Sequence, residues 1–470
     1  MKGLKRVLCI GLIAAFALSA AACGGGSNNK GGVDMGYDVA DGGYVYPSGG
    51  YGYSGKSGVG KGAYEGAIAT ADGYAAREGV DGGVEIDGDV IEVIEPDINY
   101  RAGLITASAH NDNYYYEMWK SLFLKGQTEE ENGRLFGFTG ENNWGLNSTE
   151  RVTVMVNDGE KPVAYATVYA VDEEGNNLFS ARTDASGKAY LFPNKAAKRI
   201  IAKSGDFSAE KELDGESMVI TLGGSEKKAD RIELMFVVDV TGSMGDEIRY
   251  LTKELEDVIT RVQAHFGQTT EIDLGFVFYR DHEDPVLLDK YPLINVSETQ
   301  NLEKVKKVVA AQSASGGGDY EEAVEEALMA AVDEQWTDGT STKIIFQILD
   351  APPHGNEKNV SVFNAAVLKA AEKGIRVCPI LCSGADTLCE YVMRQAAVYT
   401  GGTFVYVTDD SGIGGAHHDP EIPNDVVERL NDLMVRLIKG YHSGQFEEPV
   451  DWKTLETEEE QEQSADGQKG

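Results

Sequence analysis

The sequence predicts a multidomain protein in which a doubly wound α/β domain follows a small antiparallel β-sandwich, with disordered segments before and after them. Length is the first observation, because 470 residues exceed what one domain usually holds. The second is a repeated order of apolar strand, loop and helix after residue 229, which indicates a mainly parallel sheet covered by helices on both faces. The third is a series of short alternating runs at residues 151–223, separated by turn dipeptides such as Asp158-Gly159.

The chain is strongly acidic, with 42 Lys and Arg against 77 Asp and Glu and a formal net charge of −35. We expect no nucleic acid partner, because phosphate backbones are neutralised by Lys and Arg. Adsorption to anionic lipid through protein charge is disfavoured for the same reason. Five Cys residues are too few to make a disulfide scaffold of a chain this long.

Residues 1–22 have the pattern of a secretory signal, with basic residues followed by an apolar stretch too short for a comfortable membrane span. The run Leu18-Ser19-Ala20-Ala21-Ala22-Cys23 resembles a bacterial lipobox, although Ala20 stands where Leu is more usual. The resemblance implies lipidation of Cys23 and a protein held at the cell membrane by its lipid anchor alone, facing outside the cytoplasm. The alternative is an ordinary signal peptide with a chance cysteine.

Residues 23–95 are rich in Gly and Tyr without any helical or strand period, which predicts a disordered linker. Its Gly50-Tyr51-Gly52-Tyr53-Ser54-Gly55-Lys56-Ser57 matches the phosphate-loop pattern, but no strand precedes it and no helix follows it. We therefore expect no nucleotide binding. Residues 96–150 are predicted to be partly ordered and have no assigned role. Within them, a solvated turn at His110 and Asp112 is favoured over a metal site.

Residues 151–223 predict about seven short antiparallel strands, arranged as a sandwich. The stretch Thr183-Asp184-Ala185-Ser186-Gly187-Lys188-Ala189 resembles the turn of carboxypeptidase-regulatory-like domains. That resemblance implies a spacer or stabilising module without chemistry of its own.

The predicted α/β domain begins with an apolar run that indicates a strand buried on both faces. A helix with one apolar stripe follows it and extends to about His265. Ligands of such sheets bind at the carboxyl ends of the strands. The strands are expected at 232–239, 274–279, 344–349, 377–381 and 403–407, and the closing helix at 426–441.

Three loops at those strand ends carry oxygen ligands. The first holds Asp239, Thr241 and Ser243, the second ends in Asp319 after three glycines, and the third starts with Asp350. Hard oxygen ligands without a Cys or imidazole cluster favour Mg²⁺ or Mn²⁺, with Ca²⁺ as a further alternative. A different interpretation is that Asp239 and Ser243 cap the following helix, and capping can coexist with metal binding.

Residues 229–443 resemble the von Willebrand factor type A family, which has a Rossmann-like fold and a metal-ion-dependent adhesion site. The family pattern Asp-x-Ser/Thr-x-Ser is met at Asp239, Thr241 and Ser243, and the later family aspartate falls on Asp350. Gly-Gly-Gly-Asp puts Asp319 where the family more often has threonine, as in one branch that shares Phe278-Tyr279-Arg280-Asp281-His282 and Asp350-Ala351-Pro352-Pro353-His354-Gly355.

The resemblance implies a metal whose open coordination position accepts a carboxylate from a protein ligand. Three carboxylates would more than neutralise a divalent cation. One of them is therefore expected to bind the metal through water or to contact a ligand without touching the metal. Asp319 is the residue that departs from the family pattern.

Several other groups have a functional and a structural interpretation. For Arg280, Asp281 and His282, an ion pair that braces the loop is favoured over acid–base catalysis. For His354, packing within its loop is favoured over a role as a base near the metal. Adjacent His417 and His418 are not expected to share one ion with Asp419. Among the cysteines, Cys382–Cys389 is the preferred disulfide if one forms, and an all-reduced trio with Cys378 is the alternative. Residues 444–470 predict an acidic disordered tail.

Together these features predict a cell-envelope lipoprotein that mediates divalent-cation-dependent protein binding or adhesion. The alternative is a constitutive envelope assembly or scaffold protein that uses the same domain. We expect no enzyme, because the sequence shows no nucleophile–base pair, so a metal-dependent hydrolase ranks behind both.

Overall fold

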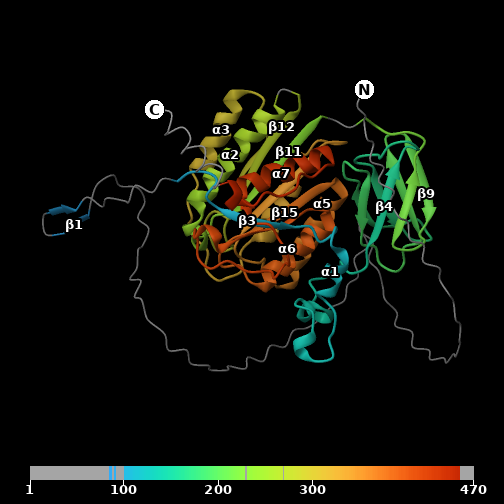
Figure 1. Ribbon diagram of the computed structural model, residues 1–470, viewed down its shortest axis with the longest axis horizontal. Coiled ribbons are helices and arrows are strands. Elements are labelled where there is room, and N and C mark those ends of the chain that lie inside the picture. The colour runs from blue at the N-terminus through green and yellow to red at the C-terminus, as the bar shows by residue number, and fades with distance from the viewer. Residues whose placement is uncertain (1–83, 87–88, 92–99, 228–229, 268, 456–470) are drawn as a thin grey trace, which may run out of the picture. The chain divides into compact units, whose positions relative to one another are not determined.

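Figure 1 shows a computed structural model of the chain, which describes residues 84–86, 89–91, 100–227, 230–267 and 269–455. The predicted signal segment, Cys23, the phosphate-loop pattern at 50–57 and the end of the acidic tail lie outside the described residues. Within the described part, no helix is both long and apolar enough to cross a membrane.

The centre of the structure is an eight-stranded sheet (Figure 1). Five neighbouring strands are parallel, as the alternation of strand and helix predicts. One antiparallel strand flanks them on one side. On the other side lie an antiparallel strand and a two-residue strand that is antiparallel to that one. In spatial order the strands are β13 (Leu288–Asn295), β12 (Glu271–Tyr279), β11 (Arg231–Asp239), β14 (Thr342–Leu349), β15 (Ile375–Leu381), β16 (Phe404–Val407), β3 (Thr106–His110) and β17 (Glu428–Arg429).

Helices cover both faces of this sheet, because successive residues of its central strands point to opposite sides. Phe236 of β11 belongs to the apolar cluster on one face and Val237 to the cluster on the other. The first face is covered by α2 (Ile248–Phe266), α3 (Thr299–Ala310) and α7 (Leu430–Ser443), and the second by α4 (Val324–Val332), α5 (Glu357–Lys373) and α6 (Thr387–Thr400). The doubly wound α/β fold is thus present.

The segment before the two small sheets contributes a strand to the central sheet. Strand β3 pairs antiparallel with β16, and α1 (Tyr116–Ser121) follows it. The expectation of a solvated turn at His110 and Asp112 is wrong, because Asp112 is 3% exposed and forms an ion pair with the buried Arg394 of α6 at 2.5 Å. Three short 3₁₀ helices follow, at Glu129–Glu131, Phe136–Phe138 and Gly140–Asn142.

Residues 152–221 form two small sheets rather than one fully antiparallel set. Their seven strands form the three-stranded order β10-β4-β7 and the four-stranded order β6-β5-β8-β9, in which β10 runs parallel to β4. The Tyr165 hydroxyl lies 2.7 Å from the Thr342 hydroxyl of β14, so these sheets contact the α/β domain directly. The strands are β4 (Val152–Asn157), β5 (Thr167–Val171), β6 (Asn177–Arg182), β7 (Lys188–Leu191), β8 (Arg199–Ser204), β9 (Phe207–Glu212) and β10 (Ser217–Thr221).

Two segments expected to be disordered have structure in their described parts. In the predicted linker, β1 (Val84–Ile86) pairs antiparallel with β2 (Asp89–Ile91), since apolar β-branched residues flank an Asp-Gly dipeptide that favours hairpins. In the predicted tail, Phe446 packs edge-on against Tyr441 and the Trp452 backbone N–H donates to the Val427 carbonyl. One aromatic contact and one backbone hydrogen bond therefore hold the beginning of the acidic tail against the domain.

Candidate functional site

The predicted ligand loop follows β11, and its geometry begins with Asp239 at the end of that strand. Asp239 is fully buried, and its Oδ1 accepts hydrogen bonds from the Thr241 backbone N–H at 2.9 Å and the Thr241 hydroxyl at 2.6 Å. The Thr241 hydroxyl in turn lies 3.1 Å from the exposed Ser243 hydroxyl. The first three predicted residues therefore converge, with Ser243 on the solvent side.

Asp350 joins this group from the end of β14. Strands β11 and β14 are adjacent and parallel, so their carboxyl ends lie at the same sheet edge. The Ser243 side chain is close enough to hydrogen-bond Asp350 and to oppose the rise in its pKa. Four of the five predicted ligands, namely Asp239, Thr241, Ser243 and Asp350, are thus brought together.

Helix capping does not account for this arrangement. The short 3₁₀ helix Gly242–Asp246 begins after Thr241, and α2 begins after Glu247. Neither start has a side-chain cap hydrogen bond. The carboxylate and hydroxyl groups of the loop therefore point to each other rather than to the helix ends.

The site contains buried carboxylate oxygens without partners. Among the described residues, Asp239 Oδ2, Asp350 Oδ1 and Glu322 Oε2 are buried and accept no hydrogen bond. Unpaired buried carboxylates are costly, so native proteins rarely keep them without a cation, a proton or water.

The cost of burying these charges raises the pKa of all three carboxyl groups. Burial raises the pKa of Asp239 to about 6, against the opposing hydrogen bonds from Thr241. Burial and the Asp239 charge raise the pKa of Asp350 to about 7. Burial, followed by repulsion from Asp239 and other acids, raises the pKa of Glu322 to about 9. In the absence of a cation, the fold thus favours protons on this site.

Glu322 is the residue that sequence reasoning missed. It is 3% exposed, its backbone N–H donates to the Pro352 carbonyl at 3.1 Å, and its Oε1 lies 2.9 Å from where a Cβ of Gly317 would be. In the sequence it stands in an acidic run before α4 and looks like a solvated helix start. The only signal in the sequence is its place three residues after the predicted ligand Asp319.

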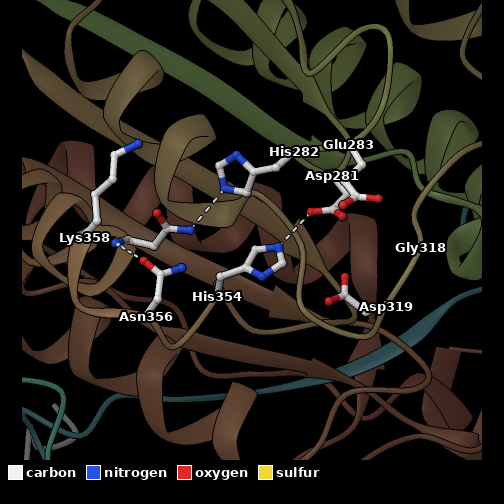
Figure 2. A pocket seen from close by; sticks show the side chains of 9 residues that line it. Asp281, His282, Glu283, Gly318, Asp319, His354, Asn356 and Lys358 are labelled. Carbon is white, nitrogen blue, oxygen red and sulfur yellow. Dashed lines mark hydrogen bonds and ion pairs between the residues drawn. The ribbon is translucent and has the colours of Figure 1, made fainter. Parts of the chain in front are cut away.

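Asp319 is found in a different group from the other predicted ligands. It is exposed, and one of its carboxylate oxygens lies within 4.8 Å of ligand atoms of both Asp281 and His354. His354 Nε2 is 2.7 Å from Asp281 Oδ1 (Figure 2). Burial works to lower the pKa of His354, but the hydrogen bond and charge of Asp281 leave it raised.

The neighbouring loop residues brace these groups. Arg280 Nε donates to the Ser315 carbonyl at 2.8 Å, which ties the loop after β12 to the loop that carries Asp319. His282 Nε2 lies 2.7 Å from Oε1 of the fully buried Glu325. Arg280 and His282 therefore connect this loop to its neighbours, whereas Asp281 pairs with His354.

The remaining candidates diverge in space. His417 contacts Glu247 and Asp409, whereas His418 contacts Glu390, so the two imidazoles do not face one ion. Cys378, Cys382 and Cys389 are buried free thiols within the described residues, and burial raises the pKa of Cys378 to about 11. The preferred Cys382–Cys389 disulfide is not formed in this structure.

Comparison with known proteins places a von Willebrand factor A domain at residues 233–408. Among solved structures, the chain is similar to the conserved hypothetical protein BatB from Bacteroides thetaiotaomicron, with 17% identity, a TM-score of 0.28, and coverage of 37% of this chain and 90% of that one. It is also similar to the pilus adhesin SpaC from Lactobacillus rhamnosus GG, with 11% identity, a TM-score of 0.29, and coverage of 50% and 32%.

A third similar structure is a mutant of the PilB minor pilin from Streptococcus sanguinis, with 10% identity, a TM-score of 0.27, and coverage of 54% of this chain and 87% of that one. No curated protein matches the chain significantly. The domain match fits a protein-binding role, and domains of this family commonly bind a divalent cation.

Proposed function

We propose that the protein binds another protein in a divalent-cation-dependent manner through the site formed by Asp239, Thr241, Ser243 and Asp350. The proposal rests on one buried carboxylate oxygen each of Asp239 and Asp350, which have no hydrogen-bond partner among the described residues and lie beside two neighbouring hydroxyl groups. Hard oxygen donors of this kind fit Mg²⁺ or Mn²⁺, with Ca²⁺ as the larger alternative.

The residues of the proposed site supply different kinds of ligand oxygen. The buried Asp239 and Asp350 supply negative charge, the buried Thr241 supplies a neutral oxygen beside them, and the exposed Ser243 supplies another on the solvent side. A bound divalent cation would supply an open position for a carboxylate of the partner. Glu322, fixed at its backbone to Pro352, lies beside these ligands and adds a third buried carboxyl group.

The proposal extends to the place where binding occurs. The signal-like residues 1–22 and the lipobox at Cys23 support a lipoprotein anchored to the cell membrane and facing outside the cytoplasm. Metabolic labelling with a palmitate analogue tests this part, with Cys23→Ser as the comparison. Label on the wild type and none on the variant is expected, and equal labelling would contradict it.

Titration calorimetry with Mg²⁺ on the purified full-length chain tests the binding site. We expect Asp239→Asn to weaken Mg²⁺ binding at least tenfold, a loss of about 1.4 kcal/mol. Asp246→Asn is the matched control, because Asp246 is an exposed acid of the next helix turn and its loss should leave binding within twofold. Absence of Mg²⁺, Mn²⁺ and Ca²⁺ binding by the wild type would refute the proposal.

The partner's dependence on the cation is a separate measurement. Immobilised wild type and Asp239→Asn are compared for capture from a cell-envelope extract, with and without chelator. Capture that requires both Asp239 and free cation is the expected result. A partner retained equally by both proteins in chelator would contradict cation-dependent binding and favour the constitutive scaffold role.

A further inference from the structure

A pocket of about 700 Å³ opens between three loops at the carboxyl ends of the central strands, and it contains a mixed nitrogen and oxygen ligand set (Figure 2). Asp281, Asp319 and His354 line it, and each offers one ligand atom within 4.8 Å of the other two. Asp281 is 3% exposed, while Asp319 is exposed, so the set runs from the pocket floor to solvent.

Hydrogen bonds that involve backbone groups hold the three loops together. Asp284 Oδ2 accepts from the backbone N–H of Asp281 at 3.1 Å and from that of Gly317 at 2.8 Å, joining the first two loops. At Gly316, with φ +84°, a Cβ would lie 2.4 Å from Asp284 Oδ1, so only glycine permits this approach. The Glu322–Pro352 hydrogen bond joins the second loop to the third, which carries His354. The three loops are therefore held together before anything binds.

A buried carboxylate beside the pocket adds negative charge. Glu325 is fully buried, with Oε1 2.7 Å from Nε2 of the pocket residue His282, and among the described residues its Oε2 has no hydrogen-bond partner. Glu325 also interacts electrostatically with His354. The ion pair with His354 gives the buried Asp281 a partner. Oε2 of Glu325 still has no hydrogen-bond partner among the described residues. A cation in the pocket would add the positive charge that these acids favour.

We propose that Asp281, Asp319 and His354 form a second cation site, separate from that of Asp239, which takes a borderline transition metal of the Zn²⁺ class. Imidazole nitrogen suits Zn²⁺, whereas Mg²⁺ and Ca²⁺ prefer all-oxygen sets. Two carboxylates and one imidazole leave a fourth tetrahedral position open, as in zinc sites that bind an external ligand.

The ligand spacing is consistent with binding after a small movement. Ligand atoms around tetrahedral Zn²⁺ are about 3.3 Å apart, which follows from bonds of about 2.0 Å. His354 Nε2 and Asp281 Oδ1 are 2.7 Å apart and need to separate slightly. Asp319 is exposed, and its ligand oxygen already lies within 4.8 Å of the other two ligand atoms. Asp319, which stands at the ligand position expected for the first cation, thus serves the second one instead.

Cobalt(II) substitution and Zn²⁺ calorimetry on the purified full-length chain, both in excess Mg²⁺, test the proposal. The wild type should bind one Zn²⁺ and show visible Co²⁺ absorption typical of a four-coordinate site with nitrogen ligation. His354→Gln and Asp319→Asn should each weaken Zn²⁺ binding at least tenfold. Asp319 is exposed, so loss of folding cannot explain the effect of its variant.

Two further variants distinguish ligation by these three residues from a general effect of negative charge and from binding at the first site. Glu283→Gln removes an exposed acid that lines the same pocket outside the ligand set, and it should change Zn²⁺ affinity less than twofold. Asp239→Asn should leave Zn²⁺ binding intact while it weakens Mg²⁺ binding, so failure of one site is distinguishable from failure of the other. No Zn²⁺ binding by the wild type, equal losses in Glu283→Gln and Asp319→Asn, or loss of Zn²⁺ in Asp239→Asn would each overturn the proposal.

Discussion

At the scale of single residues, the fold gathers three acids at the carboxyl end of the central strands and leaves each of them only partly hydrogen-bonded within the described residues. Asp239, Asp350 and Glu322 are each at most 3% exposed, and each keeps one buried oxygen without a hydrogen bond to the described residues. A structural role alone would favour Asn or Gln here, whose amide groups avoid the cost of a buried charge. The acids therefore fit the cation site proposed above.

The raised pKa values of these acids predict how cation binding depends on pH. Unfolded Asp and Glu titrate at about 4, so between about pH 4 and about pH 9 the folded, cation-free protein holds more protons than the unfolded chain. Its stability therefore falls as pH rises through that window. Mg²⁺ relieves this loss because it binds the charged forms. We therefore expect the increase in melting temperature caused by Mg²⁺ to be larger at about pH 8 than at about pH 5.

Thermal unfolding with and without Mg²⁺ at both pH values measures this dependence. Asp350→Asn removes the group whose pKa is about 7 and should flatten the pH dependence. An Mg²⁺ effect that is the same at both pH values in the wild type would contradict the assignment of the buried carboxyls to the cation.

At the scale of loops and strands, Gly317 shows how the backbone brings Glu322 to the site. Its φ is +82°, and a Cβ there would lie 2.9 Å from Glu322 Oε1 and 3.4 Å from Thr241 Cβ. We expect Gly317→Ala to weaken Mg²⁺ binding severalfold by displacing these side chains. Gly215→Ala is the matched control, because Gly215 has φ +84° and open space around its Cβ position.

Both glycine variants should lose about 1–2 kcal/mol of stability through left-handed backbone strain. Mg²⁺ affinity from calorimetry should fall only in Gly317→Ala. If both variants bind Mg²⁺ as the wild type does, the close approach of Gly317 to Glu322 and Thr241 has no part in the site.

Strand β3 depends on a buried ion pair for its attachment. Arg394 is 1% exposed, and its Nε and Nη2 donate to the two carboxylate oxygens of Asp112, at 2.9 and 2.5 Å. Asp112→Ala leaves that guanidinium buried with a vacant side and should cost about 3–5 kcal/mol of unfolding free energy. Glu117→Ala breaks an exposed pair with Lys120 in the same segment and should cost less than about 1 kcal/mol.

Urea unfolding of the two variants measures the difference. Similar losses for Asp112→Ala and Glu117→Ala would show that the buried pair does not hold β3 in place.

The parts of the fold that local pattern determines could be predicted, and the parts that long-range pairing determines could not. Strand β11 contains the unbroken apolar run Leu234–Val238 because both its faces are covered, so its sequence alone identifies it. Strand β3 has five residues and pairs with β16, far along the chain, so nothing near it in sequence indicates that pairing. Asp319 follows the same rule, because its neighbours Asp281 and His354 come from two other loops.

At the scale of the whole molecule, the small sheets and the α/β domain share contacts that should make them unfold together. Arg182 of β6 donates to the Gly339 carbonyl at 3.0 Å, and Arg376 of β15 donates back to the Arg182 carbonyl at 3.1 Å. The rings of Phe192 and Tyr399 stack with centroids 4.5 Å apart. We expect the wild type to show one calorimetric transition for both parts.

Arg182→Ala removes hydrogen bonds to the carbonyls of Gly339 and Glu372 and should cost about 1–2 kcal/mol, although Lys343 still donates to Gly339. It should also raise hydrogen exchange in β6 and β14 together. Arg199→Ala is the matched control, since Arg199 lies in β8 of the same small sheet and pairs with Glu210 at 3.1 Å. If Arg182→Ala splits the transition while Arg199→Ala keeps it whole, the contact couples the two parts. Two separate transitions in the wild type would contradict that coupling.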